Sequence, residues 1–62
     1  MNFMDRMLII VNNLKEMINN HDSVNIDDLY QFCGRPYNYR QSLQGLVKAG
    51  VIKIDGDRVS LK

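Results

Sequence analysis

The chain has 62 residues, of which 45% are hydrophobic and 24% charged, and its formal net charge is +1. This length allows one small domain and lies near the lower limit for folding without disulfides or metals. A single cysteine excludes a disulfide framework, and no apolar run approaches the roughly 18 residues of a membrane span. The composition therefore predicts a small cytoplasmic globular domain that is too short to build a large enzyme pocket.

Charge is divided unevenly along the chain. Residues 1–34 carry two basic and five acidic side chains, which gives a net charge of −3. Residues 35–62 carry six basic and two acidic side chains, which gives +4. An acidic half followed by a basic half is typical of a protein with one surface that faces a polyanion, provided that the basic residues share a face.

The first predicted element is a helix over residues 3–19, where apolar residues recur at helical spacing. A second apolar stripe, formed by Met1, Met4, Leu8 and Val11, lies beside the first. Together they make an apolar arc roughly 200° wide, against about 100° for packing on one side. We therefore expect the second stripe to be a homodimer interface through this helix. The alternative is that residues 1–5 fray and Leu8 is a scattered surface residue.

A second helix is predicted over residues 26–33. The side chain of Asn25 is placed to cap the free N–H of Asp28, as helix N-caps do. Gly34 suits the left-handed conformation that commonly follows a helix end.

A third helix is predicted over residues 36–49, with Pro36 in its first turn, where a missing N–H costs nothing. Its inward side carries Tyr39, Leu43, Leu46 and Val47. The opposite side is polar and free of acids, and it collects Tyr37, Asn38, Gln41, Gln44, Gly45 and Lys48, with Arg40 on the flank. Glycine costs about 1 kcal/mol of helix propensity, so either a close backbone approach explains Gly45 or the residue is neutral.

Residues 51–61 alternate with period two and predict a β-hairpin. Pairing Ile52 with Leu61 and Ile54 with Val59 keeps these four side chains on one buried face. The loop between the strands then has either two residues or four. Because a lone hairpin is only marginally stable, it must pack on the helices.

The order of helix, helix, short glycine-containing turn, helix and hairpin resembles the winged helix-turn-helix superfamily. The resemblance rests on Ile26-Asp-Asp-Leu29, on Leu43-x-x-Leu46-x-x-Ala49-Gly50-Val51-Ile52, and on the strand, turn and strand from Lys53 to Leu61. It implies an α+β, mostly α, fold in which residues 1–62 form one domain of three helices followed by a C-terminal wing. Two features depart from the family: the connection Gly34–Pro36 is about one residue short, and Tyr30 stands where many members carry a small residue.

In this superfamily the third helix enters the DNA major groove and the wing contacts the flanking backbone. The resemblance therefore implies a sequence-specific double-stranded DNA-binding protein, a small stand-alone transcriptional regulator of the viral or plasmid type. By position, the residues that would read bases are Tyr37, Asn38, Arg40, Gln41 and Gln44. Arg, Asn and Gln side chains can each form two hydrogen bonds with the edge of one base. Phosphates would be contacted by Arg35, Lys48, Lys53 and Arg58.

The sequence offers no catalytic constellation, because it has one His, one Cys and no glycine-rich phosphate loop. We predict a non-enzyme with no cofactor, metal or small-molecule ligand and no membrane association. Two alternatives stay open: a winged-helix module that binds another protein, and a non-specific binder of single-stranded nucleic acid or RNA. A scarcity of exposed aromatic residues, with Tyr37 as the candidate, argues against the second.

Overall fold

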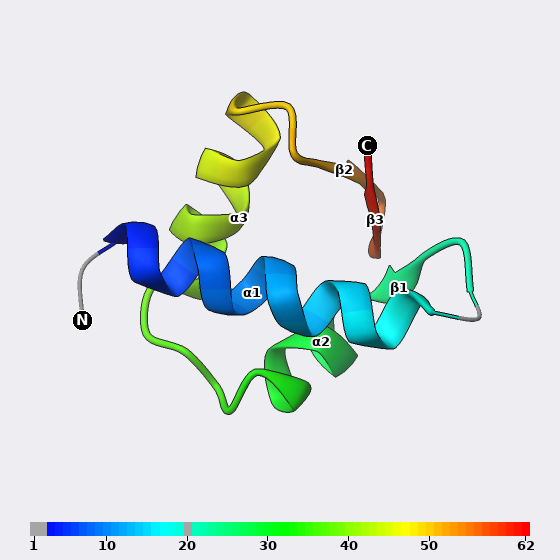
Figure 1. Cartoon of the computed structure of the whole chain (residues 1–62), viewed down its shortest axis with the longest axis horizontal. Coiled ribbons are helices and arrows are strands. Elements are labelled where there is room, and N and C mark those ends of the chain that lie inside the picture. Colours follow the sequence, from blue (N-terminus) through cyan, green and yellow to red (C-terminus); the bar gives the residue numbers. More distant parts are fainter. Residues whose placement is uncertain (1–2, 20) are drawn as a thin grey trace.

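The structure is a computed structural model that describes residues 3–19 and 21–62 (Figure 1). Its elements, in chain order, are α1 (Phe3–Ile18), β1 (Val24–Asn25), α2 (Ile26–Phe32), α3 (Tyr39–Lys48), β2 (Ile52–Asp55) and β3 (Arg58–Leu61). Three helices followed by a C-terminal hairpin confirm the predicted α+β, mostly α, class. In Figure 1, α1 runs across the front of α2 and α3, so one side of α1 faces away from the other helices.

β1 is an element that the sequence does not predict. The three strands form one antiparallel sheet in the order β1–β3–β2, with Val24 opposite Val59 and Asn25 opposite Arg58. A strand of two residues is too short to show a period-two pattern. Its consequence is mechanical: backbone pairing ties the hairpin to the segment that enters α2.

The hairpin has the predicted register, with Ile52 opposite Leu61 and Ile54 opposite Val59. The loop has two residues, the first of which is Gly56 with a φ of +63°. A positive φ at this position is what two-residue hairpin loops require. Leu61, which was expected inside, is 37% exposed because it lies at the very end of β3.

The start of α2 is confirmed. The Oδ1 atom of Asn25 accepts hydrogen bonds from the N–H groups of Asp27 (2.8 Å) and Asp28 (3.2 Å). Both residues therefore place their carboxylates in the first turn, where the helix dipole favours negative charge.

α3 begins at Tyr39, so the predicted start at Pro36 is wrong. Before it, φ is +82° at Gly34 and +56° at both Arg35 and Asn38. Residues in this left-handed region interrupt a right-handed helix, and Pro36 therefore lies in a loop. The connection between α2 and α3 spans residues 33–38, which makes it longer than the short turn expected from the sequence.

The core lies where the three helices meet the sheet. Its buried residues are Ile10, Leu14, Val24, Leu29, Tyr39, Leu43, Leu46, Ile52 and Val59. Val47 was predicted among them but is 41% exposed. Leu43 and Leu46 occupy the centre of the buried side of α3, and Val47 falls at its edge.

Candidate functional site

α3 carries a set of exposed polar side chains on the side opposite its buried residues. We call this set, formed by Arg40, Gln41, Gln44 and Lys48, the α3 face. Arg40, Gln44 and Lys48 follow one another at intervals of four residues, so they lie in line along the helix. No acidic residue occurs within α3. The exposed, acid-free side predicted from the sequence is therefore confirmed for these four residues.

The first turn of α3 is open. Asn38, at the N-cap position, is left-handed and its side chain makes no capping hydrogen bond. The first helical bond runs from the N–H of Ser42 to the carbonyl of Asn38 (3.0 Å). The N–H groups of residues 39–41 consequently have no acceptor within the helix. Such groups, together with the positive end of the helix dipole, favour a phosphate oxygen as a partner.

An open hollow of about 550 Å³ lies between the first turn of α2, the loop before α3 and the first turn of α3. Five residues predicted to contact DNA line it, namely Arg35, Tyr37, Asn38, Arg40 and Gln41, and Asp27 lies among them. The Nε of Arg35 donates to the Oε1 of Gln31 (3.1 Å), which directs this guanidinium toward α2.

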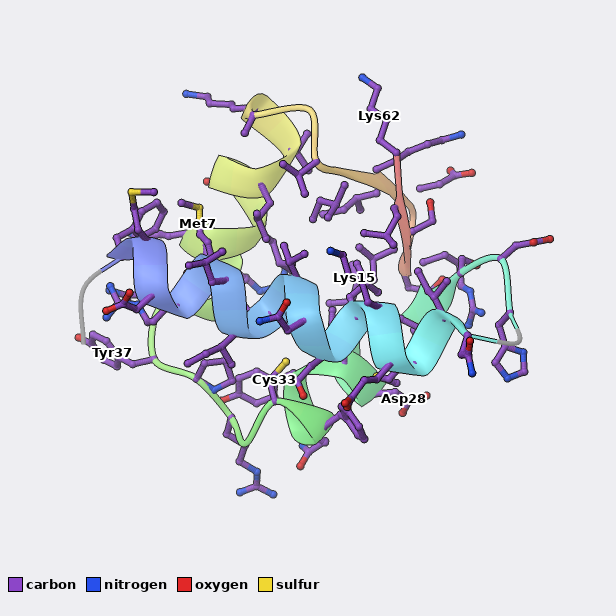
Figure 2. All side chains as sticks on the ribbon, in the orientation of Figure 1. Met7, Lys15, Asp28, Cys33, Tyr37 and Lys62 are labelled. Carbon is purple, nitrogen blue, oxygen red and sulfur yellow. The ribbon has the colours of Figure 1, made fainter. Side chains whose placement is uncertain are left out.

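Tyr37 and Asn38 are exposed as predicted, but they precede α3 instead of belonging to it. In the view of Figure 2, Tyr37 appears at the left, below the N-terminal end of α1, and 78% of its surface is exposed. Two other aromatic side chains, Phe3 (38%) and Phe32 (52%), are also exposed, so the expected scarcity of such residues is wrong.

Gly45 packs against α1 and does not belong to the polar surface on which the sequence placed it. A Cβ at this position would lie 3.1 Å from the Sδ of Met7 and 3.1 Å from the Cζ of Phe3. The close approach suggested by the glycine is therefore an approach between two helices of the same chain.

Charged residues of the hairpin are bonded to the segment before α2. The Nε of Arg58 donates to the Oγ of Ser23 (3.1 Å), and its Nη2 donates to the Ser23 carbonyl (2.7 Å). The N–H of Ile26 donates to the carbonyl of Asp57 in the hairpin loop (2.9 Å). Lys53 is exposed and lies opposite Ser60 in the sheet. Arg58 thus links β3 to the segment before α2, whereas no such bond is described for Lys53, which is exposed.

Tyr39 anchors α3 on α2. Its ring packs on the ring of Tyr30 with centroids 4.9 Å apart, and its hydroxyl donates to the carbonyl of Ile26 (2.8 Å). Burial raises the pKa of Tyr39 far above its usual value, and nearby Cys33 and Asp27 add to the effect. The large residue at position 30, unusual for the resembled family, is accommodated by this ring contact.

Cys33 is a free thiol that is half-buried and packs against the core. Burial raises the pKa of its thiol, and a hydrogen bond with Asn13 opposes that rise only in part. A raised thiol pKa lowers the thiolate fraction and with it the reactivity.

Within residues 3–19 and 21–62, no group of three His, Cys, Asp or Glu side chains lies close enough together to bind one metal ion. In the same ranges, no helix combines the length and apolar character needed to cross a membrane. No family model, curated protein or solved structure matches the chain. What the protein binds must therefore follow from its own surfaces.

Proposed function

We propose that the protein is a winged helix-turn-helix domain that binds double-stranded DNA sequence-specifically and regulates transcription. The α3 face carries this proposal, because it is an exposed helix side with Arg40, Gln41 and Gln44 and no acid. Arg bonds the O6 and N7 atoms of guanine, and Gln bonds the N6 and N7 atoms of adenine. A major groove is wide enough to admit one helix.

Phosphate contacts would come from both ends of α3 and from the hairpin. Arg35 and the open first turn lie at one end of α3, and Lys48 lies at the other. Lys53, which is exposed on β2, would add a phosphate contact from the hairpin. Arg58 is exposed, but its two bonds to Ser23 leave only part of its guanidinium for a phosphate. Contacts of this kind position a protein on the duplex without reading its sequence.

The test is binding to random duplex DNA by fluorescence anisotropy, followed by selection of a preferred site. We expect affinity for random duplex to fall steeply between about 50 and 200 mM salt, since each phosphate contacted contributes about −0.9 to the logarithmic slope. Arg40→Ala and Gln44→Ala should each weaken binding to the selected site by about 1–3 kcal/mol, with little effect on random DNA. Asn19→Ala is the matched control, because Asn19 is an exposed amide that directly follows α1 and lies outside the α3 face. No binding at about 50 mM salt would overturn the proposal.

The structure also holds an observation that favours a protein partner. Tyr37 (78% exposed) and Val47 (41% exposed) are exposed apolar residues at the edges of the α3 face. Aromatic and aliphatic residues within a polar rim are typical of protein interfaces. If the wild type does not bind DNA, a protein partner is the next candidate. Tyr37→Ala and Val47→Ser, provided that both fold, are then the first variants to test for loss of binding to that partner.

A further inference from the structure

Exposed residues on α1 and on α3 differ in how far they specify a partner. On α1, Met4 and Leu8 are 65% and 57% exposed, whereas Val11 is half-buried against the core. Met1, the fourth residue of the expected dimer interface, lies outside the described residues, and the homodimer stays a prediction. The α3 face consists of hydrogen-bonding groups, which select a partner by its own pattern of donors and acceptors.

Two glutamines and a lysine point most directly away from the core of the molecule. The buried residues of α3 are Tyr39, Ser42, Leu43 and Leu46. At about 100° per residue, Gln41, Gln44 and Lys48 lie within about 30° of the direction opposite the centre of that buried set. Arg40 lies about 70° from the same direction, on the flank. A surface in front of α3 therefore meets two amides first, and these are three residues apart.

Neither glutamine is used inside the molecule. Among the described residues, the side chains of Gln41 and Gln44 form no hydrogen bond with any other group, and both are exposed. Gln31 on α2 differs, because its Oε1 accepts a bond from the Nε of Arg35 (3.1 Å). An unused glutamine amide keeps one acceptor and two donors. This set matches the N6 amino group and the N7 atom that adenine presents in the major groove.

We infer that the DNA sequence recognised by this chain contains two successive A·T pairs, one read by Gln41 and the other by Gln44. The inference rests on the proposed function, because it concerns the groove that α3 enters. Side chains three apart on a helix are neighbours, with Cβ atoms about 5–6 Å apart. In zinc fingers, whose helices also enter the major groove, residues three apart contact successive bases.

The flanking position of Arg40 places a third base pair. Arg40 precedes Gln41 directly, at the end of α3 away from Gln44. The G·C pair that the proposed function assigns to Arg40 therefore lies beside the A·T pair of Gln41, on the side away from Gln44. The three pairs in order are G·C, A·T and A·T.

Replacing either glutamine by arginine changes the base that is read. A guanidinium bonds the O6 and N7 atoms of guanine, and arginine favours a helix about as well as glutamine does. Gln44→Arg therefore replaces one A·T pair of the target by G·C, and Gln41→Arg replaces the neighbouring pair. A residue that served only stability or general attraction to DNA would not change the preferred base at one position.

Selection of sites from random duplex DNA tests the inference on the wild type, Gln41→Arg and Gln44→Arg in parallel. We expect two successive A·T pairs in the wild-type site and one changed pair in each variant, at adjacent positions. In fluorescence anisotropy, each variant should prefer its own site to the wild-type site by about 5- to 150-fold. Gln41→Ala and Gln44→Ala should each lose the preference at the same single position without gaining another, which provides the test should an arginine variant fail to fold.

Asn19→Arg is the matched control, because it adds the same charge at an exposed amide outside the α3 face. It should strengthen binding to all sequences alike and leave the selected site unchanged. A changed base in this control would overturn the inference, since the new preference would not come from α3.

The outcomes distinguish this inference from the proposed function. A wild-type site without two successive A·T pairs overturns the inference and leaves DNA binding standing. The same holds if either arginine variant selects the wild-type site while circular dichroism shows a folded chain. If the wild type binds no duplex at about 50 mM salt, the proposed function falls and this inference falls with it.

Discussion

α3 and the hairpin differ in what the fold does with their charged side chains. On α3, Arg40, Gln44 and Lys48 are exposed along one side of the helix. On the hairpin, Arg58 is bonded to Ser23, and the loop is bonded through the Asp57 carbonyl to α2. Resemblance to a known family assigns DNA contacts to both regions, but a guanidinium that already holds two oxygens has fewer donors left for a phosphate. The comparison shows that α3 leaves its polar side chains exposed, whereas the hairpin uses part of its polar groups to contact the segment that enters α2.

Acidic residues sharpen this difference. The hairpin carries Asp55 and Asp57, and the bond from Ile26 to Asp57 brings the loop close to the first turn of α2, which contains Asp27 and Asp28. α3 contains no acid. If the proposed DNA binding holds, a polyanion would be attracted along α3 and repelled by the carboxylates of the hairpin loop, and Lys53 would be the main hairpin residue left for a backbone contact.

The largest effect is expected from the buried side of α3. Tyr39→Ala removes the ring contact with Tyr30 and the bond to the Ile26 carbonyl, and replacing a buried aromatic residue by Ala costs about 3–5 kcal/mol. A chain of 62 residues has a total stability of roughly 3–9 kcal/mol, at about 0.05–0.15 kcal/mol per residue. Thermal unfolding by circular dichroism should therefore show a largely unfolded variant.

Tyr37→Ala is the control for this experiment, because Tyr37 is 78% exposed two residues away. It should melt close to the wild type. Equal losses of stability in the two variants would contradict the division of α3 and its preceding loop into a buried and an exposed side.

A smaller loss is expected where α3 meets α1. Gly45→Leu places a side chain where Phe3 and Met7 already lie 3.1 Å from a Cβ, and overpacking of this kind costs about 1–3 kcal/mol. Chemical denaturation measures the loss, and adding Phe3→Ala in the same chain should recover part of it by making room. If Gly45→Leu keeps wild-type stability but abolishes DNA binding, Gly45 faces DNA and not α1.

Local chemistry made part of this fold predictable. The Asn25 cap and the pairing of Ile54 with Val59 depend on neighbours within a few residues, and both are visible in the sequence. The start of α3 was not predictable in the same way, because it depends on the left-handed conformation of Asn38. A residue other than glycine seldom adopts this conformation, so the sequence alone does not indicate it. The contact of Gly45 with Phe3 joins residues far apart in the chain, so no local pattern contains it.

The candidate site was predictable to the same extent. A helical wheel finds the exposed side of any helix, which is why Gln41 and Gln44 were placed correctly. It misplaced Tyr37, because the wheel was started three residues too early. The two bonds of Arg58 to Ser23 depend on β1, whose two residues carry no periodic signal.

Two substitutions in the hairpin test whether its charged residues differ in role from those of α3, and the expected change in the free energy of unfolding is about 1 kcal/mol. Arg58→Ala should lower the free energy of unfolding by that amount or less, since its bonds to Ser23 are exposed to solvent. Lys53→Ala should leave stability unchanged, weaken binding to all DNA sequences alike and flatten the salt slope by about one unit. Denaturation and anisotropy on the two variants separate the roles. A loss of affinity from Arg58→Ala as large as that from Lys53→Ala, without loss of stability, would make the hairpin a recognition element equal to α3.

An effect of similar size comes from a single hydroxyl, and it depends on pH. Tyr39→Phe keeps the ring and loses only the 2.8 Å bond to the Ile26 carbonyl, which costs about 0.5–1.5 kcal/mol at neutral pH. Because burial raises the pKa of Tyr39 in the folded chain above its ordinary value of 10.0, the unfolded chain releases this proton first as pH rises. The stabilisation is therefore complete below about pH 10 and is lost above it. Urea denaturation at intervals from pH 7 to about pH 11 should show the two stability curves converging above about pH 10. Subtracting one curve from the other removes the titration of groups that both chains share. A constant difference across that range would mean that Tyr39 ionises as readily in the folded chain as in the unfolded one, and that this side of α3 is open to water like the other.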